Sequence, residues 1–303
     1  IRPDIETIYI KPPAKRAIPS VVKYADISMN TEMEAILRHL EKERGLNFSG
    51  YRPSMIERRF TQRMSGAGCR DLASYHNYLR EQPDGLDALV DALTINVSRF
   101  FRNPLMFEYI ARKVLPRMLQ EHKYRGEHAF RVLSAGCSFG EEAYSAAILI
   151  NEILKKEDFN MDVHIFATDV DKNALKKAVN AVYPFEAVKD VKYGLLKRYF
   201  TPVSGDRGQS SNTGEDAFQL KQEICDAVSF SPYDMLNRNT FAPPESVFGG
   251  FDMVFCRNLL IYFNLEHQDR IMDKLYRAIS PHGYLILGEV EAPTSRYQRY
   301  FHK

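Results

Sequence analysis

A short apolar strand, a turn with two glycines and the start of a helix follow one another between residues 130 and 142. The sequence there is FRVLSAGCSFGEE. A strand that passes through a glycine turn into a helix is typical of the first unit of an α/β sheet, and Gly136 and Gly140 let a ligand approach the backbone closely. This segment therefore predicts a fold with a parallel sheet and a ligand site at its first turn.

Two acids follow the turn and limit which ligand it can hold. Glu141 and Glu142 stand at the helix start, where a pyrophosphate would otherwise lie. They repel phosphate but can accept hydrogen bonds from hydroxyl or ammonium groups. The turn also lacks the Gly-x-Gly-x-x-Gly and Gly-Lys-Ser/Thr patterns of phosphate loops. The segment favours a nucleoside-type cofactor without phosphates, and the alternative is a helix start whose acids interact only with the helix dipole.

An acid also ends the next predicted strand, about thirty residues beyond the glycines. Asp169 is placed to bind both hydroxyls of a ribose, whereas we expect Asp171 to cap the following helix. Capping is the alternative for either acid taken alone. A turn unsuited to phosphate and an acid suited to ribose together predict S-adenosylmethionine bound to a Rossmann-like fold.

A third segment, residues 251–263, changes abruptly from apolar to polar after a buried strand. Arg257, Asn258 and Tyr262 follow that strand, and ligands of doubly wound sheets bind beyond the carboxyl ends of the strands. We expect these side chains to face the cofactor or the methyl acceptor, although Tyr262 can also be read as a core aromatic. The chain shows no Asn/Asp-Pro-Pro-Tyr sequence, which argues against methylation of an amine.

Strand and helix patterns alternate after Gly126 and indicate a mostly parallel sheet covered on both faces. Strands are predicted at 130–135, 163–167, 251–255 and 284–287, helices at 141–154, 172–179 and 265–279, and a turn at 281–283. The polar stretch 202–216 is predicted to be a loop joining short inserted strands.

The part of the chain before this alternation has a different character. Residues 1–29 contain four prolines and no periodicity, which predicts an extended leader. Residues 30–120 predict an all-helical N-terminal domain, in which Gly45 ends the first helix and Pro53 begins the second. Residues 121–303 form the predicted α/β domain, with a small β-subdomain inserted at about 199–230.

Charge and cysteine content exclude several classes of protein. Forty-one Lys and Arg nearly balance thirty-nine Asp and Glu, for a formal net charge of +2, which argues against nucleic-acid binding. The longest apolar runs fall far short of the roughly 20 residues that span a bilayer. The four cysteines are widely spaced without a Cys-x-x-Cys pair. We expect reduced thiols, no metal site and a cytoplasmic location without membrane insertion.

Four segments resemble the chemotaxis receptor methyltransferases, the CheR family. They are 92–102 (ALTINVSRFFR), 134–145, 167–171 and 255–263, in the order found in that family. The resemblance covers about residues 31–295. It implies a helical N-terminal domain, a Rossmann-like S-adenosylmethionine domain and an inserted antiparallel β-subdomain. The implied reaction is methylation of chemoreceptor glutamates to γ-glutamyl methyl esters, with S-adenosylhomocysteine as the second product.

The resemblance also implies roles for individual residues. Besides Gly136 of the turn, the cofactor contacts fall on Asn96, Ser98, Arg102, Glu142, Asp169, Asp234, Met235, Arg257 and Asn258. Ser98 stands where Thr is common, and Asp234 where Asn is frequent; an Asp accepts from the adenine amino group but cannot donate. Arg102 and Tyr262 are implied to line the point of methyl transfer. A glutamate is already ionised near neutral pH, so we expect them to orient the acceptor rather than move protons.

The basic helix after Pro53 is the candidate docking surface for an acidic, glutamate-bearing receptor helix. Arg52, Arg59 and Arg63 are spaced by seven and four residues and are predicted to share one helical face, although a solvated face explains the same charges. Gln62 stands where the family can have a further basic residue. The long polar stretch 203–216 differs from the compact turn of tethering members, so we expect no C-terminal pentapeptide tether.

Two alternatives remain at the level of the sequence. One is a methyltransferase for another protein or for a small carboxylic acid. The other is a non-catalytic module that senses S-adenosylmethionine or S-adenosylhomocysteine. The retained Arg102 and Tyr262 favour an enzyme, because a pure sensor needs no site of methyl transfer.

Overall fold

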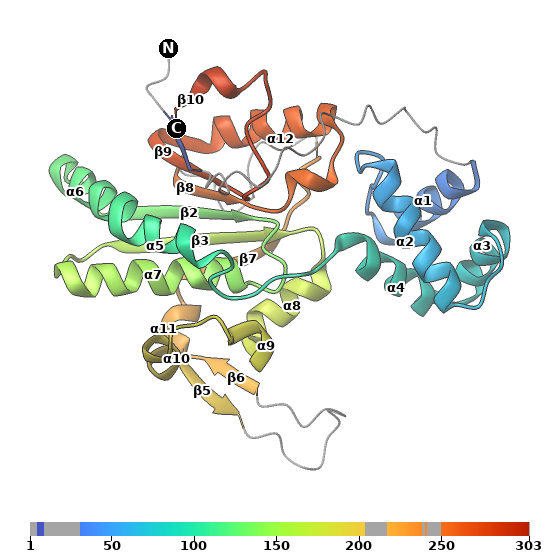
Figure 1. Cartoon of the computed structure of the whole chain (residues 1–303), viewed down its shortest axis with the longest axis horizontal. Helices are drawn as coiled ribbons and strands as arrows, with labels where there is room; N and C mark the ends of the chain where they lie inside the picture. Colours follow the sequence, from blue (N-terminus) through green and yellow to red (C-terminus); the bar gives the residue numbers. More distant parts are fainter. Residues whose placement is uncertain (1–4, 9–30, 204–216, 238–239, 241–249, 303) are drawn as a thin grey trace, which may run out of the picture.

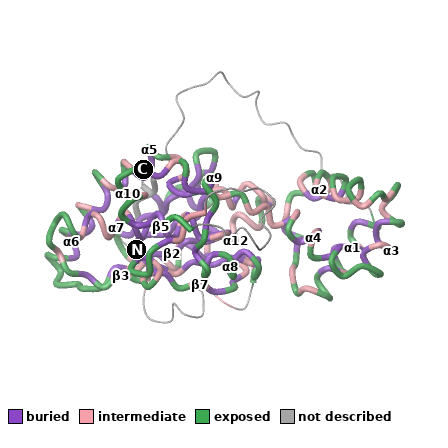
Figure 2. Tube along the Cα trace, turned by 90° about the horizontal axis from the view of Figure 1, so that it is seen from below, coloured by how far each residue is buried: buried purple, intermediate pink, exposed green. Residues whose placement is uncertain are grey.

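The computed structural model of the chain describes residues 5–8, 31–203, 217–237, 240 and 250–302. A helical group lies beside a sheet that carries helices on its faces, and a smaller sheet lies below the main one (Figure 1). Buried residues concentrate along the main sheet and its helices, with a separate set inside the helical group (Figure 2). No described helix is both long and apolar enough to cross a membrane.

The helical group has a hydrophobic core of its own. Its helices are α1 (Thr31–Arg44), α2 (Pro53–Gly66), α3 (Leu72–Glu81) and α4 (Pro83–Thr94). The predicted helix boundaries are confirmed: Gly45 follows α1 with a φ of +71°, and Pro53 stands in the first turn of α2. The core runs from Met33 to Leu93 along the chain and includes the wholly buried Leu40 and Leu89.

The next helices pack on the sheet instead of on this helical core. They are α5 (Pro104–Tyr109), a π-helical turn (Ile110–Val114) and α6 (Leu115–Arg125). Pro116 lacks an amide hydrogen, which accounts for the irregular hydrogen bonding just before it. The buried side chains from Phe100 to Leu119 belong to the same cluster as Phe130 of the sheet. The buried side chains therefore change from the helical core to the sheet core between Leu93 and Phe100. This change lies earlier in the chain than the domain boundary expected at residue 120.

The main sheet has seven described strands in the order β10-β1-β9-β8-β2-β3-β7, and all its pairs are parallel. The strands are β1 (Ile5–Ile8), β2 (Ala129–Ala135), β3 (Asp162–Asp169), β7 (Val228–Pro232), β8 (Phe251–Cys256), β9 (Ile279–Leu287) and β10 (Phe301–His302). Part of the expected leader is thus a strand: β1 lies between β9 and β10. The other leader residues lie outside the described part of the chain.

Helices cover both faces of the sheet, as predicted. They are α7 (Glu141–Glu157), α8 (Lys172–Asn180) and α12 (Leu265–Ala278). Successive residues of β2 point to opposite faces of the sheet. Val132 packs in the cluster that includes α7, and Leu133 packs in the cluster that includes α12. The parallel arrangement brings the carboxyl ends of β2, β3, β7 and β8 to one edge, the edge nearest the helical group (Figure 1).

The inserted β-subdomain is present, with different limits from those expected. Its antiparallel strands are β4 (Val182–Pro184), β5 (Phe200–Val203) and β6 (Ala217–Leu220), in the order β4-β6-β5, with the short helices α9 (Phe185–Val188), α10 (Tyr193–Tyr199) and α11 (Gln222–Cys225) around them. The expected range of 199–230 left out β4 and included the start of β7, which pairs with β3 in the main sheet. The predicted loop 202–216 joins β5 to β6, but residues 204–216 lie outside the described residues.

The turn predicted at residues 281–283 is a bulge within one continuous strand. His282 has a φ of +63°, and the register of β8 against β9 shifts between Phe251 and Met253. A Cβ on Gly283 would lie 2.6 Å from the Ile279 side chain and 3.0 Å from the Phe251 carbonyl oxygen. Pro281 and Gly283 therefore accommodate extra residues within the strand instead of ending it.

Candidate active site

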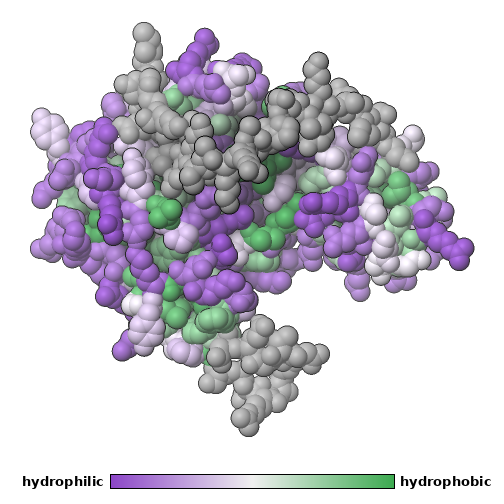
Figure 3. Space-filling model, in the orientation of Figure 1, coloured by the Kyte–Doolittle hydropathy of each residue, from purple (hydrophilic) through white to green (hydrophobic). Residues whose placement is uncertain are grey.

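A cleft lies between the helical group and the carboxyl ends of the main strands. All the residues predicted to bind the cofactor or assist transfer line it: Asn96, Ser98, Arg102, Gly136, Glu142, Asp169, Asp234, Met235, Arg257, Asn258 and Tyr262. These residues come from five segments between 96 and 262. Hydrophobic atoms are exposed near the junction of the helical group and the sheet domain (Figure 3).

The glycine turn after β2 is fixed by hydrogen bonds to β3. The amides of Gly136 and Cys137 donate to the Thr168 carbonyl at 2.8 and 2.9 Å. Gly136 has a φ of +73° and Gly140 one of +89°, and a Cβ on Gly140 would lie 2.9 Å from the Phe230 ring. Glycine is required at these positions by conformation and by the close packing of β7. The turn therefore presents its backbone to the cleft in a fixed geometry.

Asp169 lies at the end of β3 and is 8% exposed. Its carboxylate accepts hydrogen bonds from the amides of Ser138 at 2.8 Å and Asp171 at 2.9 Å. Burial raises the pKa of Asp169, while these amide donors oppose the rise. Asp171 caps α8 by accepting from the amides of Asn173 and Ala174, as predicted. Of the two acids, Asp169 faces the cleft with an orientation that the backbone determines.

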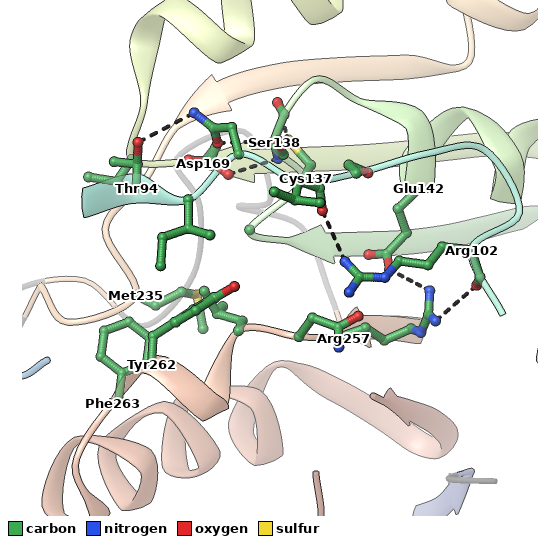
Figure 4. Close-up of a pocket in the computed structure, with 18 of the residues that line it drawn as sticks. Thr94, Arg102, Cys137, Ser138, Glu142, Asp169, Met235, Arg257, Tyr262 and Phe263 are labelled. Atoms are coloured by element: carbon green, nitrogen blue, oxygen red, sulfur yellow. Dashed lines mark hydrogen bonds and ion pairs between the residues drawn. The ribbon is translucent and has the colours of Figure 1, made fainter. Parts of the chain in front are cut away.

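Glu142 and Arg257 form a buried ion pair at the opposite end of the cleft from Asp169 (Figure 4). Their atoms lie 3.1 Å apart, and Ser134 donates to the same carboxylate at 2.9 Å. Burial raises the pKa of Glu142, and Arg257 opposes this. Among the described residues, the Arg257 Nε atom is buried and has no hydrogen-bond partner.

Arg102 and Tyr262 both line the cleft, but they come from different elements. Arg102 follows the Phe100-Phe101 pair, and its Nη1 donates to the Val97 carbonyl at 2.9 Å. Burial raises the pKa of Tyr262, and the nearby Arg102 and Arg59 oppose this rise. The phenol is therefore protonated near neutral pH and lies close to two guanidinium groups. This part of the cleft can hold a carboxylate through charge-assisted hydrogen bonds.

Asp234 and Met235 follow β7 and form another wall. The Asp234 carboxylate accepts from the Leu236 amide at 2.8 Å, and burial raises its pKa, with Lys274 opposing the rise. The buried Lys274 donates to the Tyr233 hydroxyl at 3.2 Å and also to the Asn237 carbonyl. The loop that carries Asp234 is thus held from behind by a lysine of α12.

Tyr51 and Phe263 are among the aromatic residues of the cleft that were not predicted from the sequence. They form an antiparallel bridge, and their ring centroids are 4.6 Å apart. Only this tertiary bridge makes Tyr51 part of the site, because its surroundings in the sequence resemble an ordinary helix connection. The bridge joins the helical group to the loop after β8.

The three arginines proposed for docking do not all lie on the same helix. Arg52 lies just before α2 instead of on it, and its Nε donates to the Phe263 carbonyl at 3.1 Å. The expectation of one helical face therefore fails for Arg52, because the backbone at this residue is extended. Arg59 and Arg63 are on α2, where Arg59 lies near Tyr262 and Arg63 near Tyr75.

The donors and acceptors of the cleft fit a sulfonium nucleoside with an amino-acid tail better than a phosphate-bearing ligand. Three buried or half-buried carboxylates (Glu142, Asp169 and Asp234) face it, and the turn after β2 leads into acids. Cationic sulfonium and ammonium groups compensate such acids, whereas phosphates are repelled. Arg257 lines the same cleft, and its positive charge suits a carboxylate tail. The described residues contain no cluster of His, Cys, Asp or Glu suited to a metal ion.

Comparison with known proteins identifies the family. Residues 31–94 match the model of the CheR methyltransferase all-alpha domain, and residues 96–303 match that of the CheR methyltransferase SAM binding domain. The chain belongs to the CheR methyltransferase family. It is therefore an S-adenosylmethionine-dependent methyltransferase, and the predicted fold class and cofactor are confirmed.

Relatives extend over most of the chain. Chemotaxis protein methyltransferase 2 of Vibrio cholerae is 30% identical over 85% of this chain and 84% of its own length. The chemotaxis protein methyltransferase of Escherichia coli is 29% identical over 82% of this chain and 79% of its own length. A probable biofilm formation methyltransferase, WspC of Pseudomonas aeruginosa, is 31% identical over 87% of this chain and 57% of its own length.

Proposed function

We propose that this protein transfers the methyl group of S-adenosylmethionine to glutamate side chains of chemoreceptors, forming γ-glutamyl methyl esters in chemotaxis adaptation. One observation carries the proposal: Arg102 and Tyr262, a cation and a protonated phenol, line the same cleft as the predicted cofactor residues. The relatives named chemotaxis protein methyltransferases support a receptor as the acceptor. The reaction takes place in the cytoplasm, where receptor signalling domains lie.

Each wall of the cleft holds one part of the cofactor in this proposal. Asp169 accepts from the ribose hydroxyls, and Asp234 accepts from the adenine amino group beside Met235. Glu142 and Arg257 hold the ammonium and carboxylate of the amino-acid tail. Asn96, Ser98, Gly136 and Asn258 complete the contacts. When bound, S-adenosylmethionine supplies an electrophilic methyl group.

The remaining residues orient the acceptor. A glutamate carboxylate is ionised near pH 7, so it needs no general base. Arg102 donates to it, and the Tyr262 hydroxyl, kept protonated by burial, donates a second hydrogen bond. Catalysis is then mainly a matter of holding the carboxylate oxygen about 3 Å from the methyl carbon and in line with the bond that breaks.

The partner is the acidic, glutamate-bearing helical region of a receptor, docked on α2 through Arg59 and Arg63. Arg52 assists from the start of the helix, although its bond to the Phe263 carbonyl ties it to the cleft wall. We propose no pentapeptide tether at the β-subdomain. Micromolar binding of a receptor-tail pentapeptide in a titration would contradict that part of the proposal.

The test is incubation with S-adenosylmethionine labelled on the methyl group and a receptor cytoplasmic fragment, followed by alkali. Ester formation predicts release of labelled methanol, whereas an alkali-stable label would indicate methylation of nitrogen or carbon. A receptor fragment with its candidate glutamates changed to alanine is the matched control.

A second acceptor is favoured by one comparison. The biofilm-related name of the Pseudomonas relative suggests a receptor of another signalling system, and a small carboxylic acid is the remaining enzymatic alternative. The same assay distinguishes them, because each acceptor can be supplied separately. Binding of cofactor with no transfer to any acceptor would favour the sensing module.

A further inference from the structure

Glu291, which lies just after β9, reaches beneath the loop that carries Asn258 and Tyr262. Its side chain is buried, with 5% of the residue exposed. Oε2 accepts from the amides of Asn258 at 2.7 Å and Gly288 at 2.8 Å, and Oε1 accepts from the amide of Ile261 at 3.3 Å. One carboxylate thus holds the loop at two points.

The loop needs such support because its backbone is unusual. Asn258 has a φ of +57°, a left-handed conformation that L-residues adopt at a cost. A surrounding structure must hold such a residue in place, and these residues are often found at functional sites. The Glu291 carboxylate supplies the acceptor for the Asn258 amide in this conformation.

Gly288 provides an independent indication that this contact is built into the fold. A Cβ at this position would lie 2.5 Å from Glu291 Oε2 and 3.0 Å from the Asn258 amide nitrogen. Any side chain here would push the carboxylate or the loop away. The close approach of Glu291 to Asn258 therefore depends on a glycine in the neighbouring segment.

Burial of a carboxylate costs free energy unless the charge is compensated by hydrogen bonds or by a nearby cation. Burial raises the pKa of Glu291, and the amides of Asn258, Gly288 and Ile261 oppose the rise. The described contacts of its two oxygens are to backbone amides, so the charge is stabilised by the loop that it shapes. An apolar residue would fill the same space without fixing the loop.

We propose that Glu291 is a positioning residue for methyl transfer: it fixes Asn258 at the cofactor and Tyr262 at the acceptor by binding the backbone between them. This inference rests on the proposed function of the cleft. Glu291 is not among the residues that line the cleft, so its proposed effect on binding and transfer is exerted through the loop of residues 257–262.

Two substitutions of Glu291 test separately its contact with Asn258 at one end of the loop and its contact with Ile261 at the other. In Glu291→Gln, the amide oxygen can still accept from Asn258 and Gly288, but the NH₂ group opposes the Ile261 amide, donor against donor. We expect its Kd for S-adenosylhomocysteine to change less than about threefold and its kcat to fall about 10- to 100-fold, the loss of one hydrogen bond to a charged group. Glu291→Ala loses both contacts, so its Kd should also rise at least about tenfold.

Asp252→Asn is the matched control, because Asp252 at the start of β8 accepts from the Arg131 amide at 2.8 Å, far from the cleft. It removes the negative charge of a carboxylate that also lies 3.3 Å from His122 Nε2, and it should lower stability without changing kcat. Glu291→Asp keeps the charge, so its kcat should exceed that of the alanine variant. Urea unfolding of each variant shows whether it is folded under the assay conditions.

Hydrogen–deuterium exchange gives a readout that does not depend on catalysis. The amides of Asn258 and Ile261 should exchange faster in Glu291→Ala than in the wild type or in Asp252→Asn. Unchanged exchange, or a kcat loss in Glu291→Gln no larger than in the control, overturns the positioning role. A wild-type protein that methylates no receptor fragment refutes the proposed function instead, and the exchange and Kd measurements still decide the role of Glu291.

Discussion

The guanidinium of Arg257 lies 3.1 Å from the carboxylate of Glu142, with only 2% and 12% of the two side chains exposed. The pair joins the loop after β8 to the start of α7. Arg257 also donates to the Arg102 carbonyl at 3.0 Å and to Asn103 Oδ1 at 2.6 Å. One buried cation therefore connects three segments of the cleft and sets the position of Arg102.

Removing the negative partner should destabilise the protein. Glu142→Gln leaves Arg257 buried without a compensating charge, which costs about 3 kcal/mol of unfolding free energy. Urea denaturation measures this loss. Glu157→Gln, an exposed change at the other end of α7, should alter stability by less than about 0.5 kcal/mol. Equal stabilities of the two variants would mean that the pair is not a significant source of stability.

The ribose assignment is tested by Asp169→Ala. The variant should show no detectable binding of S-adenosylhomocysteine by calorimetry, because the hydroxyls lose their acceptor and the glycine turn loses its bond to Asp169. Asp162→Ala, at the exposed start of the same strand, should bind like the wild type. Wild-type affinity in Asp169→Ala would show that the ribose lies elsewhere.

The docking role of α2 is tested by charge reversal. Arg59→Glu with Arg63→Glu should reduce kcat/KM for a receptor fragment at least about tenfold at low ionic strength, because like charges repel the acidic partner. S-adenosylhomocysteine binding should be unaffected. The same reversal at Arg112 and Arg117, on helices that cover the sheet, serves as the control. Equal rates for both double variants would remove α2 from the docking surface.

The pH dependence of stability should depend on Glu141. Burial raises its pKa from 4.5 to about 7, so the folded state binds this proton more tightly than the unfolded chain. The contribution of this proton to the free energy of unfolding is complete below the pKa of Glu141 in the unfolded chain, and it is lost as the pH rises through about 7.

Glu141→Gln should therefore stabilise the protein at pH 8 by roughly 2–3 kcal/mol relative to its effect at pH 4. Chemical denaturation at several pH values measures this, with Glu157→Gln as the control. A difference between variant and wild type that does not depend on pH would mean that folding does not raise the pKa of Glu141.

Local patterns were sufficient to predict several features of the fold and site. Glycine conformations and the acid at the end of β3 follow from the strand–turn–helix sequence, and Asp171 caps α8 because an Asp before a helix accepts from its first amides. The packing of α5 and α6 on the sheet was not predictable in this way. Their apolar faces suit either core equally well, and the choice depends on which surface the neighbouring segments leave uncovered.

The sequence by itself determined the alternation of strand and helix, the glycine turn and the acids that follow it, because these depend on backbone conformation and on charge within a few residues. Only the tertiary structure decided that Tyr51 joins the cleft, that β1 lies between β9 and β10, and that Glu291 holds Asn258. These contacts join residues between 33 and 296 positions apart, and their energies depend on burial and hydrogen-bond geometry that exist only after the chain has folded.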